Sequence, residues 1–87
     1  MLGNMVNPKQ LESKIQAQVI RQLKDSGYLV VKIGLCSLPG FPDVMALKGG
    51  AVKFIEVKRA GEKPTLLQEY RHRQLREQGF DVEVISG

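Results

Sequence analysis

PDVMALKGGAVKFIEVK, residues 42–58, contains two runs of strand-forming residues separated by a pair of glycines. The runs at residues 44–47 and 52–57 are rich in β-branched and apolar side chains, as β-strands are. A glycine pair between two such runs is a typical turn of a two-residue β-hairpin. The pattern therefore predicts an antiparallel hairpin that turns at Gly49 and Gly50.

The turn also determines which residues face each other across the hairpin. With the glycines at the turn, Lys48 faces Ala51, and counting back along both strands places Asp43 opposite Glu56. Opposed residues of an antiparallel pair have Cβ atoms about 5 Å apart on one face of the sheet. Lys58 lies two residues beyond Glu56 and so returns to that face. The sequence thus predicts two carboxylates and an ammonium group side by side.

The predicted carboxylate pair of Asp43 and Glu56 requires neutralisation by a proton or a cation. Mg²⁺ or Mn²⁺ suits such a pair because a hard divalent ion prefers oxygen ligands and keeps waters for substrate phosphates. Both side chains are therefore candidate metal ligands, and the backbone carbonyl of Val57 is a further one. Lys58 would hold or help to deprotonate an attacking water, or stabilise charge that grows on the phosphorus. This chemistry is metal-assisted hydrolysis of a phosphodiester.

A structural interpretation competes with this catalytic one. Glu-x-Lys on a strand is commonly a solvated pair, and Pro-Asp commonly opens a turn. The apolar neighbours of Glu56 favour the catalytic interpretation, because they indicate a central strand. A charged side chain is seldom buried in such a strand unless it has a partner or a function.

The arrangement resembles the PD-(D/E)xK nuclease superfamily, and within it the virus-type replication-repair nuclease (VRR-NUC) domain. The resemblance extends from about residue 11 to residue 85. The likeness is carried by ESKIQ (12–16), GFPD (40–43), FIEVK (54–58), LQ (67–68) and GFDV (79–82). It implies an α/β fold, the αβββαβ restriction-endonuclease-like core, with a mixed four-stranded sheet flanked by helices.

The resemblance also implies roles for five residues. Asp43 and Glu56 match the metal ligands, Lys58 the catalytic lysine, Glu12 the acidic residue of the first helix, which would join the metal site, and Gln68 the glutamine of the last helix. Stand-alone viral members of this family look like homodimers that act on branched DNA, including four-way (Holliday) junctions.

Two helices are predicted from the residues themselves. Apolar residues recur every four positions from Pro8 to about Ser26, before Gly27. Glu12 flanks this stripe and either reaches the metal or, as a first-turn acid, complements the helix dipole. A second helix runs from Thr65, the predicted N-cap, to about residue 78. Gln68 occupies its capping-box position, which is an alternative to a catalytic role.

The remaining chain supplies strands and loops. Residues 28–33 are predicted to form a strand whose two faces are both largely covered, with helices on each side. Residues 34–41 and 59–64 are predicted loops, and residues 80–85 a closing strand. His72 is interpreted as a surface residue.

Charge and length limit the class of protein. The 87 residues are expected to form one domain, with residues 1–7 as a tail, and the net charge of +4 favours a polyanionic partner. Six cations are candidate DNA contacts that would bind phosphates without reading sequence: Lys58, Arg59, Lys63, Arg71, Arg73 and Arg76. Alternatively, the helix arginines form a solvated face with the interspersed acids.

Our expectation is a Mg²⁺- or Mn²⁺-dependent endodeoxyribonuclease that acts on branched DNA, forms a homodimer and contacts no membrane. The single cysteine, Cys36, fits a reducing cytoplasm and excludes an internal disulfide. The alternatives are a nuclease that cuts flaps or nicks duplex DNA, a restriction-type enzyme, and a DNA-binding or assembly module without catalysis.

Overall fold

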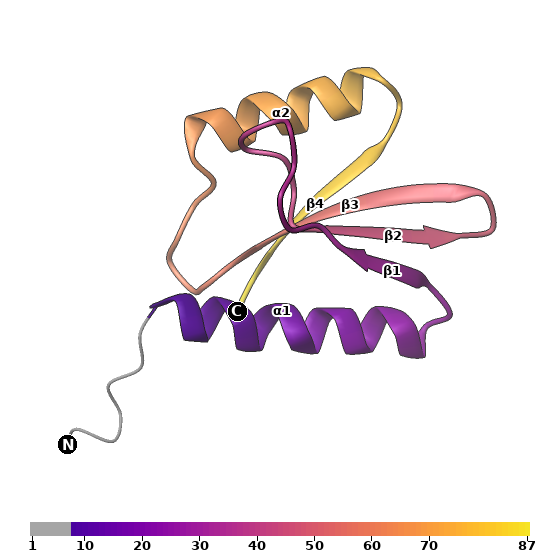
Figure 1. Cartoon of the computed structure of the whole chain (residues 1–87), viewed down its shortest axis with the longest axis horizontal. Helices are drawn as coiled ribbons and strands as arrows, with labels where there is room; N and C mark the ends of the chain where they lie inside the picture. The colour runs from indigo at the N-terminus through magenta and orange to yellow at the C-terminus, as the bar shows by residue number, and fades with distance from the viewer. Residues whose placement is uncertain (1–7) are drawn as a thin grey trace.

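The computed structural model describes residues 8–87 and consists of a four-stranded sheet between two helices (Figure 1). The predicted tail at residues 1–7 lies outside the described residues. The elements, in chain order, are α1 (Pro8–Asp25), β1 (Leu29–Lys32), β2 (Val44–Lys48), β3 (Ala51–Lys58), α2 (Leu66–Glu77) and β4 (Asp81–Ser86). The predicted α/β class and αβββαβ order are confirmed.

The sheet is mixed and has the strand order β1-β2-β3-β4. The β1–β2 and β2–β3 pairs are antiparallel, whereas β4 runs parallel to β3. The predicted hairpin register is confirmed, because Lys48 pairs with Ala51 and Val44 pairs with Ile55. Gly49 and Gly50 have φ of 57° and 81°, a backbone region that favours glycine over residues with a side chain.

The apolar core lies between α1 and one face of the sheet. Val44, Ala46, Ile55 and Val57 alternate along β2 and β3, and they pack with Val19 of α1. The period of two along each strand and the four-residue spacing along α1 bring these side chains together. This face of β2 and β3 is therefore a dry layer.

The opposite face of the sheet packs toward α2 through aromatic residues. Phe54 of β3 makes edge-to-face contacts with Phe41 and Phe80, at ring-centroid distances of 5.3 and 5.7 Å. Phe41 directly precedes Pro42-Asp43, so this contact holds the entry to β2 against the sheet.

The prediction that both faces of residues 28–33 are covered is wrong. β1 is an edge strand, and only Val30 packs against the core under α1, whereas Leu29 is 67% exposed. Apolar composition indicates burial but not the position of a strand in a sheet, and α2 packs on β4 at the opposite edge. Within residues 8–87, neither helix is long and apolar enough to cross a bilayer.

Candidate active site

Two backbone contacts position Asp43 at the entry to β2. The Val57 N–H donates to Asp43 Oδ2 over 3.0 Å, and the Asp43 carbonyl accepts a 2.8 Å bond from the Ile33 N–H. Asp43 directly precedes Val44, which pairs with Ile55, and the charge of Asp43 raises the pKa of Glu56, so the structure brings the two acids together.

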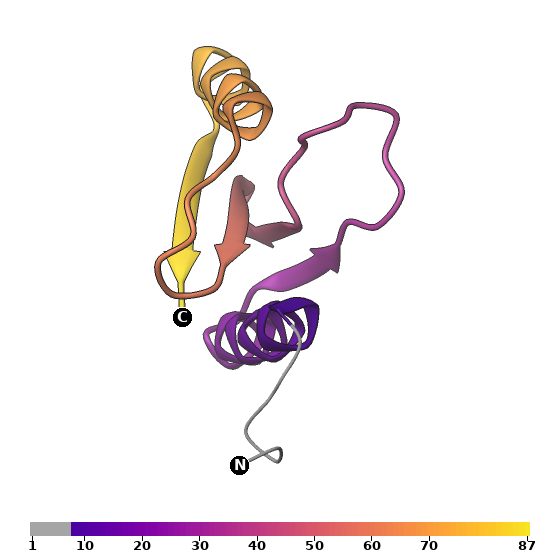
Figure 2. The ribbon, with the colours of Figure 1, turned by 90° about the vertical axis from the view of Figure 1, so that its left-hand side faces the viewer.

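The loop that leads to Asp43 is attached to α2. Gly40 has φ of 81°, and a Cβ there would lie 2.8 Å from Leu67 Cγ, so the close approach requires glycine. The Arg71 Nε–H donates to the Pro39 carbonyl over 2.9 Å. The rest of this loop projects away from the sheet (Figure 2). α2 therefore fixes the end of the loop that carries the acid.

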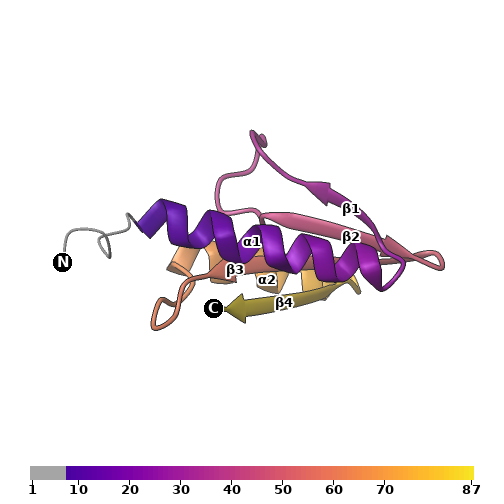
Figure 3. The ribbon, with the colours of Figure 1, turned by 90° about the horizontal axis from the view of Figure 1, so that it is seen from below.

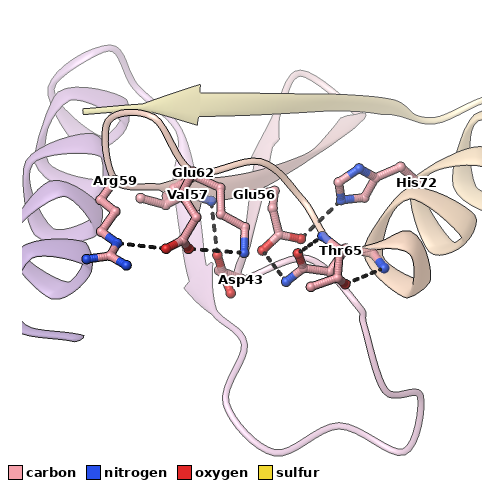
Figure 4. A network of polar contacts seen from close by, with 9 residues as sticks. Asp43, Glu56, Val57, Arg59, Glu62, Thr65 and His72 are labelled. Atoms are coloured by element: carbon pink, nitrogen blue, oxygen red, sulfur yellow. Dashed lines mark hydrogen bonds and ion pairs between the residues drawn. The ribbon is translucent and has the colours of Figure 1, made fainter. Parts of the chain in front are cut away.

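Glu56 is buried on β3, with an exposed fraction of 1%, and α2 contacts its carboxyl group. Figure 4 shows His72 of α2 pointing toward this carboxyl group, with its Nε2 3.0 Å from Oε1. Gln68 of the same helix places its Nε2 3.4 Å from Oε2. Gln68 also completes the predicted capping box with Thr65. Its capping and site interpretations are therefore compatible.

The interpretation of His72 as a surface residue is wrong, because its exposed fraction is 2%. The spacing of four residues from Gln68 places both side chains on one face of α2, and that spacing was the available signal in the sequence. Burial, and then the charge of Arg76, lower the pKa of His72. The lowered pKa favours the neutral imidazole, and the tautomer of that ring decides which group donates the hydrogen bond between His72 Nε2 and Glu56 Oε1.

The surroundings of Glu56 favour the protonated form of its carboxyl group. Burial, a hydrogen bond to Asp43 and the charge of Asp43 raise the pKa of Glu56 from 4.5 to about 8. Lys58 opposes this rise but does not cancel it. Two adjacent carboxylates are stabilised either by a shared proton or by a divalent cation. The raised pKa corresponds to the shared proton.

Lys58 is also buried, with 7% of its surface exposed, and its Nζ lies 3.7 Å from Glu62 Oε1. Glu62 accepts a 2.7 Å bond from the Arg59 Nε–H, which lowers the pKa of Glu62. A hydrogen bond between Glu12 and Glu62 raises the pKa of Glu12. The loop after β3 thereby brings Glu62 to Lys58 and to Glu12 of α1.

A pocket of about 240 Å³ lies beside these residues, lined by Glu12, Ser13, Gln16, Asp43 and Val57. Glu12 therefore faces the same space as Asp43. Its alternative role as a first-turn acid is wrong, because α1 begins at Pro8 and its first turn contains no acid. Among residues 8–87, no three His, Cys, Asp or Glu side chains are gathered as a complete ligand set. Two carboxylates, a backbone carbonyl and waters still suit Mg²⁺, which binds few protein ligands.

The six candidate DNA-binding cations differ in their contacts. Arg71 and Arg76 donate to the backbone carbonyls of Pro39 and Val82, both over 2.9 Å. Arg73 lies over the ring of Tyr70 at 5.8 Å. Lys58 and Arg59 both contact Glu62, and Lys63 is exposed in the loop that follows β3. Most of these cations therefore already bind groups of the protein.

Comparison with known proteins identifies relatives of the whole described fold. A protein of Acyrthosiphon pisum secondary endosymbiont phage 1, named "Putative nuclease p44", is 32% identical over 76 residues, which cover 86% of this chain and 82% of that protein. A solved structure described as a VRR_NUC domain matches with a TM-score of 0.76 and 31% identity, covering 87% of this chain and 83% of that one. No family profile matches the chain. The two relatives nevertheless agree with the fold, and the chain belongs to the VRR-NUC family of nucleases.

Proposed function

We propose that the protein is a metal-dependent endodeoxyribonuclease that hydrolyses phosphodiester bonds in branched DNA, such as four-way junctions. The observation that carries the proposal is the proximity of the Asp43 and Glu56 carboxyl groups beside a pocket that Asp43 lines. A buried carboxyl with a pKa of about 8 has an electrostatic cost that a divalent cation would remove.

Asp43, Glu56 and the Val57 carbonyl would hold Mg²⁺ or Mn²⁺, with Glu12 reaching the same pocket. The bound ion would polarise the scissile phosphate and lower the pKa of an attacking water. The Lys58 ammonium group would orient that water and stabilise negative charge on the phosphorus. Glu62, which lies 3.7 Å from Lys58, would keep the ammonium group in place before substrate arrives.

Gln68 and His72 would act on the reaction through Glu56. Each contacts one oxygen of its carboxyl group, so the two contacts together fix its rotation. A buried side chain held at both oxygens is pre-organised for a cation, as residues that orient ligands are in metal sites generally.

A homodimer is part of the proposal, and the exposed edge of the sheet supports it. Within residues 8–87, no strand pairs with the outer edge of β1, and Leu29 and Val31 are exposed beside it. A second copy that pairs there would cover this edge and place two sites around a two-fold axis, suited to paired cuts in symmetric strands. The exposed thiol of Cys36 supports a cytoplasmic location, because free thiols persist in reducing compartments.

The test is incubation of purified protein with an end-labelled four-way junction in Mg²⁺, Mn²⁺ or EDTA, with flap and linear duplex substrates alongside. We expect cutting that requires the cation and is fastest on the junction, with loss of cutting in Lys58→Ala. Light scattering measures whether the protein is a dimer. Metal-independent binding without any cutting would overturn the nuclease proposal and favour a DNA-binding module. Faster cutting of flaps or duplex would overturn the junction preference.

A further inference from the structure

A second hollow, of about 320 Å³, lies between α1 and the edge strand β1. Ala17 and Ile20 of α1 form its apolar floor, and Arg21, Lys24 and Lys32 supply its charge. Lys32 lies two residues after Val30, which packs against the core under α1, so both side chains leave β1 on the α1 face. Figure 3 shows α1 lying across this face of the sheet, with β1 at the edge. We call this hollow the α1–β1 groove.

The α1–β1 groove has an unbalanced positive charge. Its lining contains three cations and no carboxylate, whereas Glu12 and Asp43 line the active-site pocket. Among the residues that the structure describes, Arg21, Lys24 and Lys32 form no ion pair. Their charge is therefore available to a ligand, in contrast to that of Arg59, which is neutralised by Glu62.

The groove adjoins the candidate active site. Ser13 and Gln16 line both the α1–β1 groove and the active-site pocket, so these two residues mark the border between them. On the sheet, Lys32 pairs with Val44, the residue that follows Asp43. A DNA strand whose scissile phosphate lies at the active-site carboxylates would therefore place its neighbouring phosphates near the groove cations.

The groove also has a length that suits several nucleotides. From Ser13 to Lys24 the helix rises about 16 Å, at about 1.5 Å per residue. Phosphates of one B-DNA strand recur about every 3.4 Å along the duplex axis, so about four or five of them fit this length.

We propose that the α1–β1 groove binds the backbone of the DNA strand on one side of the scissile phosphate. This inference rests on the proposed nuclease function and extends it with a second set of contacts, Arg21, Lys24 and Lys32. The three cations come from two elements that converge only in the fold. The ligand is a run of phosphodiesters, whose charge the three cations would contact whatever the base sequence.

The test compares two double variants that lose the same charge. Lys24→Gln/Lys32→Gln removes two groove cations, while Lys14→Gln/Lys53→Gln removes an exposed lysine of α1 and the partner of Glu83. Binding of a labelled junction and a duplex is measured from low to high salt with Mg²⁺, in a Glu56→Gln background that prevents cutting. We expect the groove variant to lower the slope of log K against log[salt] by about 1.8 on duplex, at about 0.9 per phosphate contact, and the control to lower it far less.

A second measurement locates the contact. Neutral methylphosphonates are placed at successive linkages on either side of the cut. Substitutions on one side of the cut should weaken binding of the protein whose groove is intact. The same substitutions should have little further effect on the Lys24→Gln/Lys32→Gln variant. Equal slopes for the two double variants, equal effects of the methylphosphonates on both, or no DNA binding at all would overturn the groove assignment. The nuclease proposal is judged separately, by cation-dependent cutting of the protein that retains Glu56.

Discussion

The two faces of the sheet use the same strands for different purposes. Toward α1, Val44, Ala46 and Ile55 are fully buried among apolar side chains and have no polar partner to satisfy. Toward α2, Glu56 on the neighbouring position of β3 is as deeply buried, but its oxygens face His72 and Gln68. Neighbouring residues of β3 therefore have different roles: Ile55 stabilises the fold, and Glu56 is suited to binding a metal ion.

This alternation explains why the chain can tolerate a buried acid. The apolar face lowers the free energy of folding by burial, at roughly 25 cal/mol per Å² of apolar surface. That contribution offsets the cost of holding a carboxyl group away from water on the other face. The two faces should thus respond to mutation in different ways: the α2 face through activity and metal binding, and the α1 face through stability.

The largest effect is expected on the α2 face, from Glu56→Gln. The amide keeps the shape of the side chain but removes the negative charge that a cation requires, so junction cutting should fall by about 10³-fold or more. Cutting rates of the purified variants measure this. Glu83→Gln, which removes an acid paired with Lys53 at the surface, serves as the control and should cut normally. A Glu56→Gln protein that cuts at the parent rate would contradict the assignment of the site.

The matching change on the α1 face is Ile55→Ala, one residue away. Ile55 is fully buried, and truncation of a buried isoleucine costs about 2–5 kcal/mol of stability. Urea unfolding should show this loss, while Mn²⁺ affinity stays within twofold of the parent at a temperature where the variant is folded. Leu29→Ala, at an exposed position of the edge strand, should change stability by less than about 0.5 kcal/mol. A large loss of Mn²⁺ affinity in folded Ile55→Ala would show that the faces are not independent.

The sequence predicts the α1 face and the hairpin well because both depend on local patterns. A glycine pair sets the turn, the turn sets the register that pairs Val44 with Ile55, and the residues next to these two, Asp43 and Glu56, come together. The burial of His72 does not follow from the sequence, because its contact with Glu56 joins residues 16 positions apart and depends on how α2 packs on the sheet. The exposure of residues 29–31 does not follow either, because composition does not say which strand lies at an edge. The α1–β1 groove likewise depends on the fold, since its cations come from two separate elements.

A smaller effect is expected from His72→Ala, which leaves Glu56 intact but removes one of its two contacts. Loss of a group that orients a metal ligand typically lowers metal affinity by about 10–100-fold. Titration calorimetry with Mn²⁺ should show this, and His72→Gln should recover part of the affinity because its amide also donates a hydrogen bond. Glu77→Gln, on the exposed end of α2, is the control. Lower stability of His72→Ala with unchanged Mn²⁺ affinity would assign His72 to packing alone.

The smallest effect is a dependence of stability on pH that only the α2 face should produce. Because the pKa of Glu56 is about 8 in the folded protein and 4.5 ordinarily, the folded state binds more protons than the unfolded chain between these values. Stability in EDTA should therefore decrease as pH rises through this window, by at most about 1.4 kcal/mol per pH unit. His72 acts in the opposite sense, because its lowered pKa reduces stability as pH falls below its ordinary 6.5. The effect of Glu56 is thus clearest from about pH 7 to 8, where the imidazole is neutral in both states.

Unfolding by urea at a series of pH values, with and without Mg²⁺, separates the two contributions. Glu56→Gln should flatten the decrease between about pH 7 and 8, whereas Ile55→Ala should lower the whole curve without changing its shape. Mg²⁺ should stabilise the parent more at pH 8 than at pH 7, because the cation displaces the proton that Glu56 otherwise holds. A parent curve that is flat over this range, or one whose slope survives Glu56→Gln, would mean that the carboxyl group is already ionised in the fold. The cation would then have no proton to displace, and the charge on the α2 face would have to be balanced by Lys58 instead.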